Sequence, residues 1–178
     1  TKADAQIKTW ISQDRFDFFE GSHNGYERLP NAPATHTRSI LFLKNDYWIM
    51  RDFVKTSGEH EYALNFHFKA ETDAAIESAE NGGFCVNQTP TAINTGMRLF
   101  TFGDNGNWKR KESWISTCYG ARVNAPFLRF ISKGEGAQEF FTFLLPSEIG
   151  FDAPEVFETE INGGRAFVVK YRDYQDIF

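Results

Sequence analysis

Cysteine, proline and long apolar runs are scarce in this chain of 178 residues, and each scarcity excludes a class of protein. The two cysteines, Cys85 and Cys118, are too few for a disulfide-dense scaffold or a four-cysteine zinc site. With 14 glycines and 6 prolines, the chain is not a low-complexity linker. No apolar run approaches the roughly 18 residues that a transmembrane helix needs, so we expect no membrane partner.

Positive charge is also in short supply. Lys and Arg total 19 against 24 Asp and Glu, which gives a net charge of −5, so we expect no nucleic-acid partner. Aromatic residues, in contrast, are abundant, with 19 Phe, 6 Tyr and 4 Trp, and this composition excludes a disordered chain. The length suits one domain with a real core, and we expect a single domain over residues 1–178.

The hydrophobic pattern is that of β-strands. Two apolar runs, 39–44 and 47–50, flank the tight-turn signal Asn45-Asp46 and predict a hairpin. Residues 59–68 alternate strictly, with Tyr62, Leu64, Phe66 and Phe68 on one face, which predicts a half-buried strand. Because only 56–58 separate this strand from the hairpin, we expect the three to form a meander.

The rest of the chain follows the same pattern. Five further strands are predicted, at 84–86, 98–102, 127–131, 139–145 and 165–171. Gly-rich turns are predicted at 82–83, 103–106, 133–136 and 162–164. Only 73–80, with Ala74, Ala75 and Ala79, has a helical character, so the fold has room for one short helix. About ten to twelve strands with such turns indicate an all-β, antiparallel sandwich or barrel.

The best binding candidates start the first hairpin strand. His36 and Arg38 lie two residues apart and therefore project from one face. Both can donate hydrogen bonds, and an Arg fork binds a carboxylate or sulfate bidentately, so the pair could hold an acidic sugar. The alternative is structural, with Arg38 paired to a nearby acid such as Asp52 and orienting the strands. The residues favour this structural alternative.

Other chemistry-bearing residues give weaker signals. The four histidines, His23, His36, His60 and His67, show no zinc-ligand spacing, and we expect no metal and no cofactor. No nucleophile elbow is present, and no pair of carboxylates stands out for glycoside hydrolysis. The basic cluster 109–111 is typical of a solvated turn or edge strand, with a smaller chance of contact with an anionic ligand. A Cys85–Cys118 disulfide and glycosylation at 87–89 stay open.

A family resemblance goes further than these patterns. The segments that carry it are 25–29 (Gly-Tyr-Glu-Arg-Leu), 36–44 (His-Thr-Arg-Ser-Ile-Leu-Phe-Leu-Lys), 47–52 (Tyr-Trp-Ile-Met-Arg-Asp), 58–60, 114–122, 125–126 and 143–146. Over roughly residues 14–146 the chain resembles the C-terminal domain of the heparinase II/III-like family. The resemblance implies an antiparallel β-sandwich, and Tyr26, in the first matching segment, joins His36 and Arg38 as a substrate-binding candidate.

Members of this family are bacterial polysaccharide lyases with an N-terminal helical toroid and a C-terminal sandwich. They cleave uronate-containing chains such as heparan sulfate or alginate by β-elimination. The resemblance therefore implies a helical toroid domain and an acidic polysaccharide as partners, and a periplasmic or secreted location. The family's sandwich usually adds a histidine and zinc ligands, but these motifs are absent here. We expect the C-terminal fragment of a larger lyase, with no catalytic residue of its own.

The alternative is a free-standing carbohydrate-binding or interaction module. An accessory sandwich predicts a large apolar patch where the toroid docks, and a free-standing module predicts an exposed aromatic platform. A lyase that works alone would require a base and a carboxylate neutraliser, which the sequence does not offer.

Overall fold

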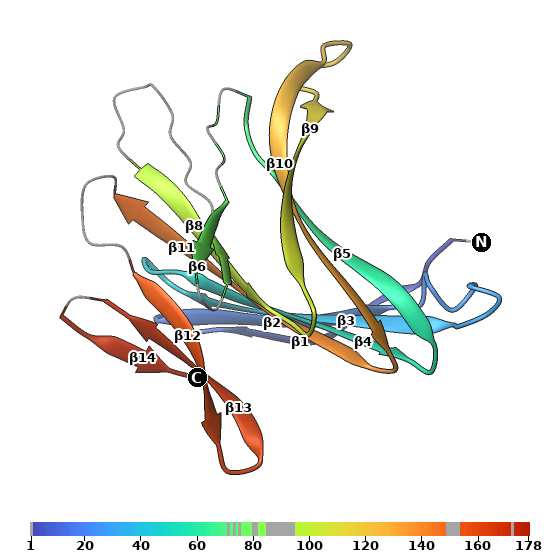
Figure 1. Ribbon diagram of the computed structural model, residues 1–178, viewed down its shortest axis with the longest axis horizontal. Helices are drawn as coiled ribbons and strands as arrows, with labels where there is room; N and C mark the ends of the chain where they lie inside the picture. Colours follow the sequence, from blue (N-terminus) through green and yellow to red (C-terminus); the bar gives the residue numbers. More distant parts are fainter. Residues whose placement is uncertain are drawn as a thin grey trace. The chain divides into compact units, whose positions relative to one another are not determined.

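The computed structural model describes residues 2–70, 72, 74, 76–79, 82–84, 95–148, 154–171 and 173–178. Every regular element in these residues is a β-strand (Figure 1). The strands are β1 Ala5–Ser12, β2 Phe16–His23, β3 Ala34–Leu43, β4 Trp48–Thr56, β5 Glu59–His67, β6 Glu77–Ala79, β7 Gly82–Phe84, β8 Thr95–Phe102, β9 Asn107–Ile115, β10 Val123–Glu135, β11 Gln138–Glu148, β12 Glu155–Ile161, β13 Gly164–Lys170 and β14 Gln175–Ile177. The chain is an all-β, antiparallel sandwich, as expected.

The chain divides into two compact units. The first comprises residues 1–63, 101–106 and 131–144, and the second comprises 64–100, 107–130 and 145–178. Some strands pass from one unit into the other, and each unit is described by itself. The expectation of a single domain over 1–178 stays a prediction.

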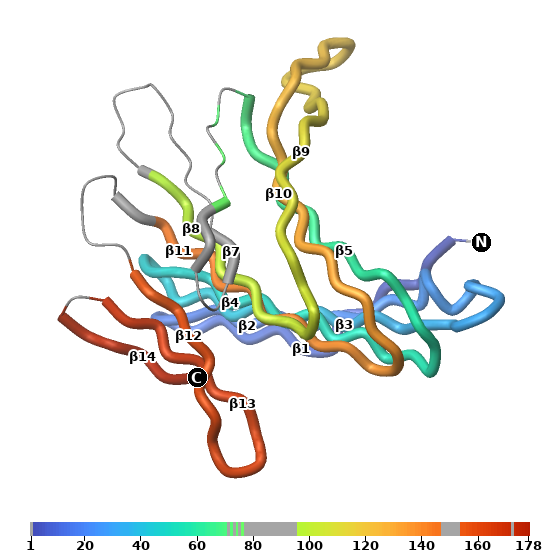
Figure 2. The backbone as a smooth tube through the Cα atoms, in the orientation of Figure 1, coloured from blue at the N-terminus to red at the C-terminus, as the bar shows by residue number. Residues whose placement is uncertain are grey.

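The first unit holds most of a six-stranded sheet with the order β1-β2-β3-β4-β11-β8. Strands β1 to β4 run side by side in chain order, as the blue and cyan segments of Figure 2 show. The predicted hairpin is confirmed, because β3 pairs with β4 in antiparallel register from Ala34↔Thr56 to Phe42↔Trp48. Asn45 takes a φ of 66° in its turn, a left-handed conformation that Asn tolerates better than most residues.

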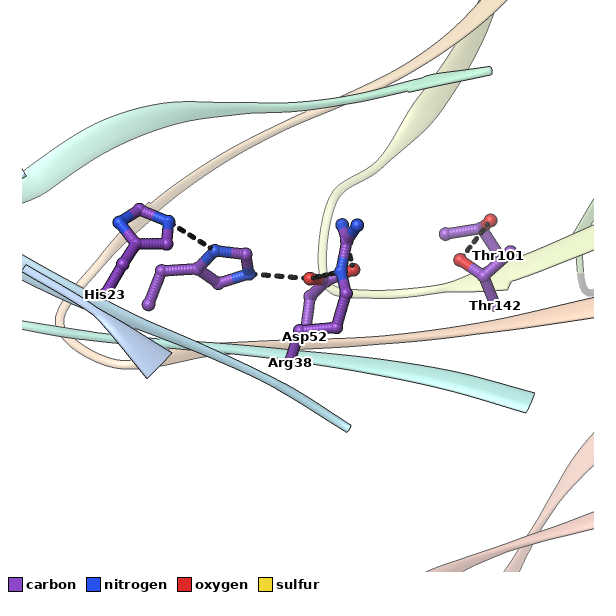
Figure 3. Close-up of polar contacts among 6 residues, drawn as sticks. His23, Arg38, Asp52, Thr101 and Thr142 are labelled. Carbon is purple, nitrogen blue, oxygen red and sulfur yellow. Dashed lines mark hydrogen bonds and ion pairs between the residues drawn. The ribbon is translucent and has the colours of Figure 1, made fainter. Parts of the chain in front are cut away.

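Aromatic side chains fill the core of this unit. Tyr47 and Phe143 are fully buried, and Phe140 is 1% exposed. The Tyr62 ring lies 5.6 Å from that of Phe140, and the Phe102 ring meets Phe143 edge-on at 5.9 Å. The buried hydroxyls of Thr101 and Thr142 satisfy each other at 2.9 Å (Figure 3). The sheet therefore forms a rigid support for the polar side chains that it carries.

The second unit contains most of the three-stranded sheet β5-β10-β9, together with the sheet β12-β13-β14. In the first of these sheets Trp108 packs against Phe66 and Phe130, with ring centroids 5.7 and 5.4 Å apart. In the second, Val169 is fully buried and Phe167 is 3% exposed. Apolar burial on this scale is the main stabilising contribution to a domain of this size.

Several expectations about the elements are wrong. The 59–67 strand, β5, does not complete a meander with β3 and β4; it pairs with β10 in the second sheet, and β4 pairs with β11 instead. Alternation of apolar and polar residues along a strand predicts which face is buried, but it does not predict which strand lies next to it. Residues 77–79, in the segment expected to have helical character, form β6, and the predicted turn at 82–83 lies in its partner β7. Most of the turn predicted at 133–136 also lies in a strand, because β10 extends to Glu135.

The other predicted strands that the structure describes are present, and most are longer than expected. The turns at Gly103–Gly106 and around Gly163 are also confirmed. None of the described residues forms a helix that is long and apolar enough to cross a membrane.

Candidate functional site

Adjacent strands bring four polar side chains together on one face of the six-stranded sheet. His23 at the end of β2 lies opposite His36 on β3, and Arg38 on β3 lies opposite Asp52 on β4. Directly paired residues of an antiparallel sheet project to the same face, so the register alone aligns the four. Gly21 is the β2 partner of Arg38, and the Phe19 ring lies where a Gly21 side chain would project.

Asp52 is the centre of this group, which we call the His–Asp–Arg cluster (His23, His36, Arg38 and Asp52). Arg38 binds Asp52 bidentately, with Nε 2.7 Å from Oδ1 and Nη2 3.1 Å from Oδ2. His36 Nε2 lies 2.6 Å from the same Oδ1. The side chain of Asp52 is only 4% exposed, against 42% for Arg38. Figure 3 shows the contacts of this ion pair, which has a buried acid and a half-exposed base.

The two histidines form a directed chain of hydrogen bonds. The backbone N–H of Gly25 donates to His23 Nδ1 at 3.2 Å, so this nitrogen carries no proton. A neutral His23 then has its proton on Nε2 and donates to His36 Nδ1, 3.1 Å away. His36 consequently carries its proton on Nε2 and donates to Asp52. Every ring nitrogen of both histidines is engaged.

Electrostatics agree with this assignment. Burial opposes the charge on Asp52, but the hydrogen bonds from His36 and Arg38 outweigh burial and hold the pKa of this carboxyl below its usual range. Burial and the nearby positive charge of Arg38 lower the pKa of His23. Asp52 is thus ionised and His23 neutral near pH 7, and the charge of Arg38 is balanced by Asp52.

The structure brings Tyr26 to the same cluster. Its ring centroid lies 5.2 Å from that of His23, and its side chain is 48% exposed. His36 has no ring nitrogen left for a ligand, whereas the remaining N–H groups of Arg38 have no acceptor among the described residues. The expected structural pair, Arg38 with Asp52, is present. Contact of Tyr26, His36 or Arg38 with substrate stays a prediction.

Sequence reasoning missed His23. Its neighbours in β2 show no clean alternation, since all eight side chains of that strand are partly exposed. The available signal was the short segment between His23 and His36, which allows a hairpin with the two rings opposite each other. Without a prediction of β2, that register could not be proposed.

The other candidates lie away from the cluster in the sequence and in their contacts. His60 Nε2 lies 3.2 Å from the Thr56 hydroxyl, and His67 stacks on Phe127 at 4.9 Å. Cys118 is exposed and forms no disulfide with a residue that the structure describes. Cys85 and the possible glycosylation site 87–89 lie outside the described residues. In the described part of the chain, no three His, Cys, Asp or Glu side chains converge as metal ligands would.

Solved structures share the fold of the whole chain. A heparinase III with methylated lysines matches with a TM-score of 0.78 and 21% identity, over 98% of this chain and 27% of its own. The heparan sulfate lyase HepC of Pedobacter heparinus matches with a TM-score of 0.80 and 17% identity, over the same two shares. A further heparinase III structure matches with a TM-score of 0.76 and 12% identity. This chain thus spans about a quarter of the length of these relatives.

Sequence comparison gives the family. No curated protein sequence matches the chain. The family model "Heparinase II/III-like, C-terminal" matches residues 2–140, which is most of the chain and includes every residue of the His–Asp–Arg cluster. The chain therefore belongs to the heparinase II/III-like C-terminal family.

Proposed function

We propose that this chain is the accessory C-terminal sandwich of a polysaccharide lyase that cleaves uronate-containing polysaccharides by β-elimination. The chain has no elimination activity by itself and works with an N-terminal helical toroid. The observation that carries the proposal is the family match over residues 2–140, supported by a fold shared with about a quarter of a heparan sulfate lyase. A lyase of this kind meets its polymer outside the cytoplasm, in the periplasm or after secretion.

The chemistry of the cluster favours an accessory role. β-Elimination needs a base that removes a proton from the sugar ring, and the base needs a free lone pair within reach of that proton. In His23 and His36 both ring nitrogens are already used. Arg38 is the one member with free donors, and it suits a carboxylate or sulfate of the polymer. We assign Arg38 and Tyr26, whose ring lies next to that of His23, to substrate contact, and His36 to a positioning role.

The edge of the first unit's sheet suits a second domain. β1 is the outermost strand of its sheet, and it exposes large apolar side chains: Ile7 is 74%, Trp10 67% and Ile11 40% exposed. An open edge with apolar side chains is unusual for a surface that stays in water, and it is typical of one that another domain covers. These exposed side chains support the accessory role, for which we expect an apolar surface where the toroid docks.

The test compares this chain with the protein encoded by its complete gene. Each is incubated with heparan sulfate and with alginate, and the unsaturated product is followed by the ultraviolet absorbance of its new double bond. We expect product from the complete protein and none from residues 1–178 alone. Product from the chain alone would contradict the accessory role, and a complete protein that lacks a toroid and is inactive on a panel of uronate polysaccharides would contradict the lyase.

A free-standing carbohydrate-binding module is the second candidate. The second unit exposes two large aromatic side chains near each other in the sequence, Trp114 on β9 at 58% and Tyr119 fully, and the Arg122 guanidinium lies 5.0 Å from the centre of the Trp114 ring. An exposed aromatic ring can stack on a sugar ring. The gene sequence that precedes this segment distinguishes the two candidates, because a toroid encoded there belongs only to the lyase.

A further inference from the structure

The sheet β5-β10-β9 has two very different faces within the second unit. Even-numbered side chains point into the core: Leu64, Leu128 and Phe130 are at most 8% exposed, and Trp108 packs between Phe66 and Phe130. Successive side chains of a strand alternate between faces, so the odd-numbered residues point outward. We call this outward surface the basic face; it comprises Asn65, His67, Asn107, Lys109, Lys111, Phe127 and Arg129.

The basic face carries an unbalanced positive charge. Lys109 and Lys111 are exposed on β9, and neither forms an ion pair with a described residue. Arg129, on the neighbouring strand β10, has a buried Nε with no hydrogen-bond acceptor among the described residues. The chain as a whole has a net charge of −5, so this concentration of cations runs against its overall composition.

Acidic side chains are kept off this part of the sheet. Glu112 on β9 points to the other face, where Arg110 and Asn124 bind it at 2.7 and 3.1 Å. The outward acid Glu61 lies near the start of β5 and is paired with Lys133 at 3.9 Å. The exposed Lys109 and Lys111 therefore remain available to an anion from outside.

The remaining side chains of the face suit a sugar polymer. Phe127 stacks almost parallel on His67, with 13° between the rings at 4.9 Å, and it is only partly buried. An aromatic ring offers an apolar surface to the C–H groups of a pyranose, and the amides of Asn65 and Asn107 can bind hydroxyls. Lys109 and Lys111 are roughly 7 Å apart along the strand, and three strands span about 10 Å. That is room for a few sugar units.

We propose that the basic face binds an acidic polysaccharide through its carboxylate or sulfate groups, as a binding site separate in its residues from the His–Asp–Arg cluster. The choice of a polysaccharide over another polyanion rests on the proposed function. Such a site holds the polymer without taking part in its cleavage.

The test is calorimetric titration of the chain with oligosaccharides of heparan sulfate and of alginate, at low and at high salt. Lys109→Ala/Lys111→Ala should weaken binding roughly tenfold, since two charge-assisted contacts are lost. The matched control, Lys55→Ala/Lys170→Ala, removes the same charge from strands of other sheets, β4 and β13, and should leave affinity nearly unchanged. Binding of alginate would assign the site to carboxylates, and binding of heparan sulfate alone to sulfates. In both cases added salt should weaken it.

Three results would overturn the proposal. Wild-type chain without measurable affinity for either polymer at low salt excludes the site. If the two double variants lose affinity equally, binding depends on the overall charge of the chain and not on the basic face. Poly-glutamate bound as tightly as the oligosaccharides, with the same dependence on Lys109 and Lys111, assigns the face to an acidic protein. Because the titration measures no cleavage, failure of the lyase assay and failure of this site are separate outcomes.

Discussion

At the scale of single residues, Asp52 explains most of what the cluster does. Its carboxylate is almost fully buried and accepts hydrogen bonds from His36 and Arg38. A buried charge without partners is strongly destabilising, so these donors are a structural requirement before any ligand arrives. The half-exposed Arg38 can do both tasks, because one edge of its guanidinium holds Asp52 and its other N–H groups remain for an anion.

Arg38→Ala should lower the free energy of unfolding by about 2 kcal/mol, because it removes the bidentate partner of a buried carboxylate. Urea denaturation followed by circular dichroism measures the change. Arg51→Ala is the matched control on the same sheet, since its pair with Glu139 is more exposed, at 40% and 27% for the two side chains. We expect the control to cost less than about 1 kcal/mol. Equal losses in the two variants would show that Asp52 does not depend on Arg38.

The stability of the chain should fall as the pH drops below about 6.5, the ordinary pKa of histidine. The pKa of His23 is lower in the folded chain than in the unfolded chain. Between these two pKa values the unfolded state binds more protons, so acidification favours unfolding. Asp52, whose folded pKa is also lowered, adds a further loss at more acidic pH.

His23→Asn is the variant for this pH dependence. Its Oδ1 can still accept from the Gly25 N–H, but the side chain does not titrate. Thermal unfolding measured from pH 7.5 to 5 should show a flatter profile for this variant than for the wild type. A profile with the same slope would mean that His23 is not the group that titrates.

At the scale of elements, the short connection between β4 and β5, residues 57–58, links two different sheets. Gly58 lies in this connection, and its backbone carbonyl accepts a hydrogen bond from the Gly136 N–H at 3.1 Å. A Cβ at Gly58 would lie 2.4 Å from the Cβ of Ala32, which is itself 8% exposed. The alanine methyl cannot rotate away, so the connection has room only for glycine.

Gly58→Ala should destabilise the chain by about 1–3 kcal/mol through this overlap. Ala32→Gly in the same chain removes the opposing methyl and should restore part of the loss, which a double-mutant cycle in urea measures. Ser57→Ala, at the exposed neighbouring position, should change little. The absence of any coupling between positions 32 and 58 would refute the explanation.

The elements also show where sequence reasoning succeeds. The β3–β4 hairpin was predictable because Asn45-Asp46 supplies the turn chemistry locally. β1 and β2 were not, because an edge strand that exposes nearly every side chain, such as β1, has no hydrophobic alternation. The pairing of β5 with β10 joins segments far apart in the sequence, and no local pattern encodes it. The Arg38–Asp52 pair could be proposed because both residues lie on the predicted hairpin, whereas His23 was missed because it lies on β2, which was not predicted.

At the scale of the whole molecule, the net charge of −5 would repel an acidic polymer at long range. The binding that we propose would therefore depend on local concentrations of cations. Lys109, Lys111 and Arg129 form such a concentration, whereas the charge of the half-exposed Arg38 is balanced by Asp52. The large apolar side chains of β1 belong to neither place, and under the proposed function they would contact the toroid domain.

The pairing of His23 with His36 also governs how the sheet assembles. A slip of β2 against β3 by one position would carry the two rings to opposite faces, and a slip of β3 against β4 would separate Arg38 from Asp52. In either misaligned sheet a carboxylate or an imidazole would be buried without its partner. The His–Asp–Arg cluster thus raises the free energy of misaligned sheets. It favours one alignment in strands whose weak alternation of exposed and buried side chains would not specify the alignment by itself.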